Sequence, residues 1–170
     1  MLIRKASQKD LNEICVIIEQ AKLFLKQQGI DQWQNGYPNP EVVADDINSG
    51  IAYVADNGSV CGYCVIVMGD DPNYKVILEG DWKNSEPYVA VHRVCVSNQV
   101  RGQGTAGALF QKAQDICVEH DIHNLKIDTH PQNLAMQRAI QKAGFTYCGK
   151  IHLLSPAENG AERWAYQKCF

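Results

Sequence analysis

The chain has 170 residues, of which 45% are hydrophobic and 21% charged. This composition fits one globular domain, which buries roughly 70% of the surface that its unfolded chain exposes and needs no disulfide framework. A formal net charge of −3 at pH 7 gives no basic footprint, so nucleic acid is not expected as a partner. No uncharged apolar run reaches the roughly 18 residues of a membrane span, and the opening MLIRKASQKD does not resemble a targeting segment.

The first half of the chain predicts a strand at about 2–5 and helices at about 8–27 and 40–49. A hairpin follows, with strands at about 51–55 and 60–68. Ser7 and Asp10 have capping-box spacing at the start of the first helix. Asn39 precedes Pro40 in the order typical of a second helix start. The tight turn 56–58 contains the Asn-Gly pair that favours a hairpin.

The second half begins with a polar stretch, 69–87, which predicts a loop with room for one strand at 74–78. Further strands are expected at 88–96, 125–128, 145–154 and 163–169, and two helices at 105–118 and 133–143. This order predicts an α/β fold around a mixed, mostly antiparallel sheet with one parallel crossover.

The seven cysteines are odd in number and scattered, at positions 15, 61, 64, 95, 117, 148 and 169. Most have apolar neighbours, which predicts reduced thiols packed in a cytoplasmic protein. Cys61 and Cys64 form a C-x-x-C pair, but on a strand they would face opposite sides, and no second pair completes a zinc site. His120 and His123 lack a metalloprotease glutamate, so no metal is predicted.

The glycine turn that follows strand 88–96 carries the sharpest functional signal. Gly102 and Gly104 lie where a helix begins, and unpaired N–H groups at a helix start favour an anion, with Arg101 as an adjacent cation. The glycines could instead serve only the conformation of a surface turn. A nucleoside-triphosphate loop is excluded because its lysine and hydroxyl residue are missing.

A dinucleotide site is a closer alternative, because Gly102, Gly104 and Gly107 match G-x-G-x-x-G and Asp128 follows 21 residues later. Two observations oppose it. Five residues, 97–101, separate the strand from the first glycine, and only 42 residues remain after Asp128, too few for the rest of a doubly wound sheet.

The segment from Arg101 to Ala106, RGQGTA, fits the R-x-x-G-x-G/A signature of the GNAT superfamily of acetyl-CoA-dependent N-acetyltransferases. Asn133 followed by Gly144-Phe145 resembles a second segment of that family. The order of elements is similar along essentially all of residues 1–170, which implies a single GNAT domain. The resemblance implies a mixed sheet flanked by helices, with a splayed strand pair that forms the acetyl-CoA cleft.

The resemblance also implies site residues for the acyl donor. The pyrophosphate would lie on the turn formed by Arg101, Gly102, Gln103, Gly104, Thr105 and Ala106. The pantetheine arm would pair with the backbone of Val94, Cys95 and Val96. Asn133 would contact the arm, or would only cap the helix that follows it.

The implied reaction is direct attack of a primary amine on the thioester, which requires a proton acceptor because such amines are mostly protonated near pH 7. His92 is the titrating side chain on strand 88–96, and its parity with Val94 leaves a core histidine as the alternative. Arg93 would then lie on the other face. Ile140 occupies the position where many relatives carry a tyrosine acid, and Tyr88 or Tyr147 could substitute for it.

The acceptor site should come from the first two helices, their loop and the stretch 69–87. Trp33 and Tyr37 would line it or anchor the loop, and Glu79 would attract an ammonium group or lie in a solvated loop. The expected acceptor is a small-molecule or peptide amine, and a homodimer through the carboxyl-terminal strand is left open. The alternatives to acetyl transfer are transfer of another acyl group and a non-catalytic CoA-binding module.

Overall fold

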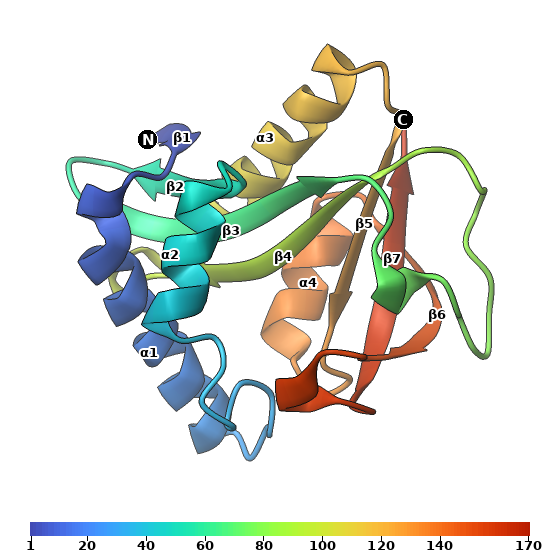
Figure 1. Cartoon of the computed structure of the whole chain (residues 1–170), viewed down its shortest axis with the longest axis horizontal. Helices are drawn as coiled ribbons and strands as arrows, with labels where there is room; N and C mark the ends of the chain where they lie inside the picture. The colour runs from blue at the N-terminus through green and yellow to red at the C-terminus, as the bar shows by residue number, and fades with distance from the viewer.

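The computed structural model describes residues 1–170 and contains one seven-stranded sheet in the order β1-β2-β3-β4-β5-β7-β6 (Figure 1). The strands are β1 (Leu2–Lys5), β2 (Ala52–Asp56), β3 (Val60–Met68), β4 (Val89–Val96), β5 (Asn124–Thr129), β6 (Thr146–His152) and β7 (Glu162–Cys169). Only β4 and β5 pair in parallel, and every other neighbouring pair is antiparallel. The predicted mixed, mostly antiparallel sheet is confirmed.

Four α-helices cover the sheet: α1 (Leu11–Gln27), α2 (Pro40–Asn48), α3 (Thr105–Glu119) and α4 (Leu134–Lys142). Four 3-10 turns accompany them: η1 (Gln8–Asp10), η2 (Pro72–Tyr74), η3 (Asn98–Val100) and η4 (Pro156–Glu158). Helices α1 and α2, together with η2, lie over one side of the sheet, and α3 and α4 lie behind it (Figure 1). We call these sides the α1/α2 face and the α3/α4 face.

Each face of the sheet has its own apolar core. On the α3/α4 face, 18 buried residues pack together, among them Leu109 of α3, Ile127 of β5 and Ile140 of α4. On the α1/α2 face, 14 buried residues form a second cluster that includes Ile14 and Val43. The apolar faces predicted for the helices at 8–27 and 105–118 are therefore the faces that pack against the sheet.

Two local predictions were tested by the structure with different outcomes. The capping contact at the first helix is confirmed, because the backbone N–H of Ser7 donates to Oδ2 of Asp10 at 2.7 Å. The strand expected at 74–78 is wrong. Asp71 instead accepts the N–H of Asn73 and starts η2, and Leu78 forms only an isolated bridge with Lys150. None of the helices has the length and apolar character that a membrane crossing requires.

Candidate active site

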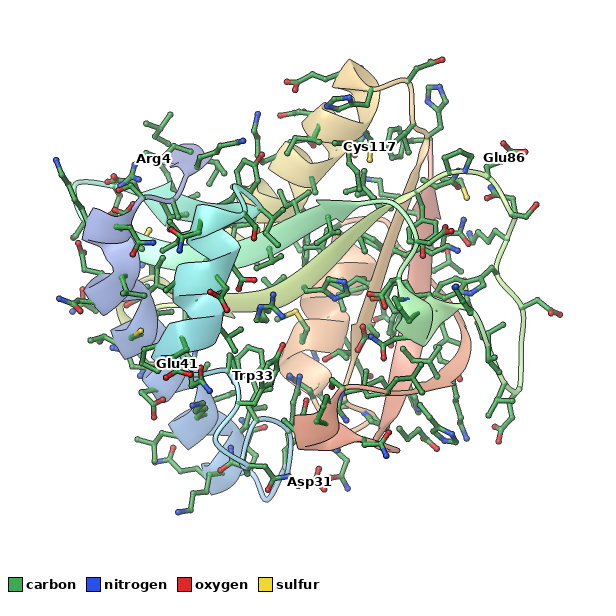
Figure 2. All side chains as sticks on the ribbon, in the orientation of Figure 1. Arg4, Asp31, Trp33, Glu41, Glu86 and Cys117 are labelled. Carbon is green, nitrogen blue, oxygen red and sulfur yellow. The ribbon has the colours of Figure 1, made fainter.

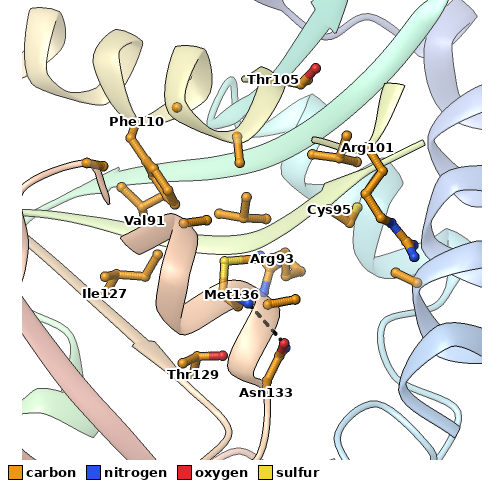
Figure 3. Close-up of a pocket in the computed structure, with 18 of the residues that line it drawn as sticks. Val91, Arg93, Cys95, Arg101, Thr105, Phe110, Ile127, Thr129, Asn133 and Met136 are labelled. Carbon is orange, nitrogen blue, oxygen red and sulfur yellow. Dashed lines mark hydrogen bonds between the residues drawn. The ribbon is translucent and has the colours of Figure 1, made fainter. Parts of the chain in front are cut away.

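The sheet opens between its two parallel strands. β4 pairs with β5 only from Val89 to Val91, opposite Leu125 to Ile127. Beyond the Val91–Ile127 pair, β4 stays bonded to β3 and β5 stays bonded to β7, so the two strands part. A cavity of about 760 Å³ occupies this gap and is lined by β4, β5, the glycine turn, α3 and α4 (Figure 3). The splayed strand pair expected from the sequence is therefore present.

The glycine turn forms one end of the cavity. Gly102 and Gly104 have φ angles of 81° and 86°, a left-handed region that other residues adopt only with strain. This conformation starts α3 at Thr105 and leaves the N–H groups of Gly102, Gly104, Thr105 and Ala106 without a partner in the protein. Four outward N–H groups at the positive end of a helix suit a phosphate group.

The turn is held by its neighbours on both sides. The guanidinium of Arg101 lies 4.0 Å from the ring centre of Phe24 on α1 and donates to Oδ1 of Asn98 at 2.6 Å. The start of α3 lies very close to β3, because a Cβ on Gly62 would approach Cγ2 of Thr105 to 2.8 Å. Of the turn residues predicted to hold the pyrophosphate, five line the cavity and Gln103 does not.

A β-bulge in β4 sets which side chains reach each face. Val65 of β3 pairs with His92 and Tyr63 pairs with Cys95, so Arg93 and Val94 together oppose one residue of β3. Arg93 takes a φ of 53° at this point. The predicted parity is therefore wrong: Val94 packs on the α3/α4 face, whereas the guanidinium of Arg93 reaches Asp46 of α2 on the α1/α2 face.

The Arg93 side chain belongs to a buried polar network. It makes two hydrogen bonds to the carboxylate of Asp46, at 3.0 Å and 2.6 Å, and donates to the hydroxyl oxygen of Tyr37. Tyr63 donates to the same carboxylate at 2.6 Å. Tyr37 thus anchors its loop to β4 and does not line the cavity. The network fixes the bulge against α2.

His92 also belongs to the α1/α2 side, because its register partner Val65 packs in that core. Its Nε2 lies 2.9 Å from Oδ2 of Asp71, and its ring is 5.8 Å from that of Tyr74. His92 does not line the cavity. The catalytic role predicted for it stays a prediction.

Asp128 lines the cavity, although its sequence position suggested only the ribose-binding acid of a dinucleotide site. It lies one residue past the last β4–β5 pair. The hydroxyl of Tyr74 donates to its Oδ1 at 2.7 Å, and burial raises the pKa of its carboxyl group. The sequence did hold a signal for this placement, because Asp128 lies at the carboxyl end of a predicted strand beside the predicted cleft.

Two polar residues, Thr129 at the end of β5 and Asn133 at the start of α4, line the cavity. The hydroxyl of Thr129 is buried and has no hydrogen-bond partner. The same holds for the indole N–H of Trp164, which lies opposite Thr129 on β7. Asn133 caps α4 by accepting the N–H of Met136 at 3.1 Å (Figure 3). This bond confirms the predicted capping role, and Nδ2 of Asn133 donates to Oε1 of Gln32 at 3.1 Å.

The loop between α1 and α2 closes the lower end of the site. Trp33 lies on its inner side and lines the cavity, while Asp31 is at the outer tip (Figure 2). Asp31 pairs with His130 at 2.9 Å, which joins this loop to the β5–α4 loop.

Glu79 and Ile140, two positions considered for the site from the sequence alone, do not line the cavity. Glu79 is exposed and pairs with Lys150 at 2.7 Å. Ile140 is fully buried in the α3/α4 core, where a tyrosine hydroxyl would need a partner. Five of the seven cysteines are buried, and of these Cys95 lines the cavity, where burial raises the pKa of its thiol.

Comparison with known proteins agrees with this geometry. Residues 19–145 match the model of the acetyltransferase (GNAT) family. A GNAT-family acetyltransferase structure from Streptococcus agalactiae is 34% identical, with a TM-score of 0.86 over 99% of this chain and 95% of that one. Among curated proteins, none matches this sequence significantly.

More distant structures share the fold. A GNAT-family acetyltransferase from Listeria monocytogenes is 19% identical, with a TM-score of 0.71 over 99% of this chain and 94% of that one. A Salmonella typhimurium structure that contains acetyl-CoA is 18% identical, with a TM-score of 0.67 over 99% and 92% of the two chains. Since the family model covers most of the sequence, the chain is a member of the GNAT family of acetyltransferases.

Proposed function

We propose that residues 1–170 form one N-acetyltransferase domain that moves the acetyl group of acetyl-CoA to a primary amine by direct attack. The observation that carries this proposal is the joint placement of the glycine turn and the strand gap on one cavity. An anion site at one end and unpaired strand backbone along the wall suit a donor that has a diphosphate joined to an extended amide arm.

The residues predicted on the donor side of the cavity would act as follows. The free N–H groups of the turn would bind the pyrophosphate, with the Arg101 guanidinium beside it. The backbone of Val94, Cys95 and Val96 has no partner on β5 and would pair with the pantetheine amides. Because Thr129 has a buried hydroxyl without a partner, we assign it a hydrogen bond to the bound arm. Asn133 would orient the arm from the start of α4.

The acceptor would approach from the α1/α2 face. Trp33 stays in this proposal as a lining residue, and Tyr37 acts on the site through Arg93. Glu79 is left out because it is exposed and paired with Lys150. In the reaction, the amine nitrogen bonds to the thioester carbonyl carbon, the C–S bond breaks, and CoA leaves as a thiolate. The amine must lose a proton for this step.

Two measurements test the proposal. CoA binding is followed by calorimetry, and thiol release from acetyl-CoA is followed with a panel of primary amines: spermine, tyramine, kanamycin, a peptide with a free amino terminus and one with an internal lysine. We expect micromolar CoA binding and amine-dependent thiol release. Binding of CoA without turnover on any amine would favour a non-catalytic module. Faster release from a longer acyl-CoA would favour another acyl group, and binding of NAD in place of CoA would contradict the proposal.

A further inference from the structure

The carboxylates around the acceptor side differ in whether a basic side chain pairs with them. Four of them are paired with a basic side chain: Asp31 with His130, Asp46 with Arg93, Asp71 with His92 and Glu158 with Arg163. Asp128 forms no such pair, and Tyr74 is its only side-chain partner. A carboxylate in a cavity without a cation of its own is available to a cation that enters.

The position of Asp128 is fixed by the sheet. Ile127, the last residue of β5 that pairs with β4, packs on the α3/α4 face. The next residue therefore points to the opposite face, where its register partner Ala165 packs with Tyr74 and Ala90. Asp128 thus lies at the mouth of the strand gap, on the face from which the acceptor would come.

We infer that Asp128 is the catalytic base, taking the proton from the acceptor amine through its free Oδ2. This inference rests on the proposed function. The amine arrives as an ammonium ion and hydrogen-bonds to Oδ2, which takes one proton and leaves a neutral amine with a free electron pair. That nitrogen bonds to the thioester carbon, the C–S bond breaks, and its electron pair leaves with the CoA thiolate. The second N–H proton passes to this thiolate, so the products are the amide and the CoA thiol, and Asp128 returns its proton to solvent after they leave.

The surroundings of Asp128 suit this role. Partial burial on this face weakens the solvation of the charged carboxylate and raises its proton affinity, while attack on the carbonyl lowers that of the amine nitrogen. The titratable groups that face it are Tyr74 and Asp71 from the η2 segment, His92 from β4 and Arg163 from β7. His92 and Arg163 each hold a carboxylate of their own, so neither neutralises Asp128 directly.

Tyr74 is a positioning residue in this scheme. It is buried, its ring packs against Trp82 and His92, and its hydroxyl holds Oδ1 of Asp128 at 2.7 Å. This contact orients the carboxylate and leaves Oδ2 free. A hydrogen bond donated to a carboxylate also favours its charged form. Tyr74 therefore sets both the direction and the acidity of the base.

The test uses the fastest amine of the panel and acetyl-CoA, with kcat/KM measured from pH 5.5 to 9.5. We expect Asp128→Asn to lower kcat/KM at pH 7.5 by about 100-fold or more, with the CoA Kd within twofold of wild type. Its remaining activity should rise steadily toward the pKa of the amine. Tyr74→Phe should move the acidic limb of the profile to higher pH and keep the plateau, which a purely structural defect would not do.

Two further variants make the result decisive. Glu79→Gln removes an exposed carboxylate that does not line the cavity, and it should keep kcat/KM within twofold. His92→Gln should reduce activity far less than Asp128→Asn. If Asp128→Asn keeps a third or more of the activity while His92→Gln abolishes it, the inference is overturned and His92 is the base. A wild type that binds CoA but releases no thiol with any amine overturns the proposed function and this inference together.

Discussion

The backbone N–H of Trp33 donates to Oε1 of Glu158 at 2.9 Å, and this hydrogen bond joins the α1–α2 loop to the β6–β7 loop. The same carboxylate oxygen accepts from Nη2 of Arg163 at 3.0 Å, and both side chains of that ion pair are nearly inaccessible to solvent. Asn35 adds a second link to this loop through the carbonyl oxygen of Ala157. A buried ion pair thus supports the loop that carries a wall of the cavity.

Removal of that carboxylate should destabilise the fold. Glu158→Ala leaves the Arg163 charge buried without a partner, which costs about 3–5 kcal/mol in the free energy of unfolding. Urea unfolding followed by far-UV circular dichroism measures this loss. The double variant Glu158→Met with Arg163→Met should recover much of it, because no unpaired charge remains. Equal stability of Glu158→Ala and wild type would contradict the assignment.

The glycine turn should require its left-handed backbone for donor binding. Gly104→Ala meets no atom within 4 Å, so its cost comes from the φ of 86° alone, about 1 kcal/mol. We expect relaxation of the turn to raise the CoA Kd about tenfold, measured by calorimetry. Gly58→Ala is the matched control, since it combines a φ of 110° with open space in a hairpin turn outside the cavity lining. It should cost similar stability and leave CoA binding unchanged.

The hydroxyl of Thr129 should contribute to donor binding and not to folding. Because it is buried without a partner in the free protein, Thr129→Val should leave the unfolding free energy unchanged or slightly higher. The CoA Kd should rise about three- to tenfold, the value of one hydrogen bond. Thr129→Ser should bind CoA like wild type. A stable Thr129→Val protein with unchanged CoA affinity would show that the bound arm does not reach this hydroxyl.

Stability should fall in acid through Asp10. Its carboxylate accepts two hydrogen bonds from Arg4, at 2.9 Å and 2.8 Å, and further bonds from Ser7, which together hold its pKa far below the ordinary value. The unfolded chain therefore binds this proton at higher pH than the native state does. The stabilisation is complete above roughly pH 4 and is lost as the pH falls through the folded pKa.

The measurement is urea unfolding between pH 2.5 and pH 7 for wild type and Asp10→Asn. We expect Asp10→Asn to lose on the order of 2 kcal/mol at pH 7, because a charge-assisted network is broken. The difference between the two proteins should shrink as the pH falls. A constant difference over the whole range would rule out the carboxylate as its source.

The sequence by itself determined most of the elements, the fold class and the glycine turn at the start of α3. These signals are local: amphipathic periods, capping residues at Ser7 and Asn39, and glycines placed at a helix start depend on short-range backbone geometry. The strand expected at 74–78 failed because Tyr74 is buried on a 3-10 turn, where its contacts with Trp82 and Asp128 outweigh its strand preference.

Only the tertiary structure decided which side chains share the α1/α2 side of the strand gap. The bulge at Arg93 separates His92 from Val94 and turns Arg93 toward Asp46, and no alternation rule predicts the extra residue. Asp128 and Tyr74 are 54 residues apart in the chain, so their contact exists only after β5 and η2 have come together. The glycine turn is encoded by adjacent residues, whereas the α1/α2 side of the strand gap is assembled from distant ones, and for that reason the sequence predicted the first and not the second.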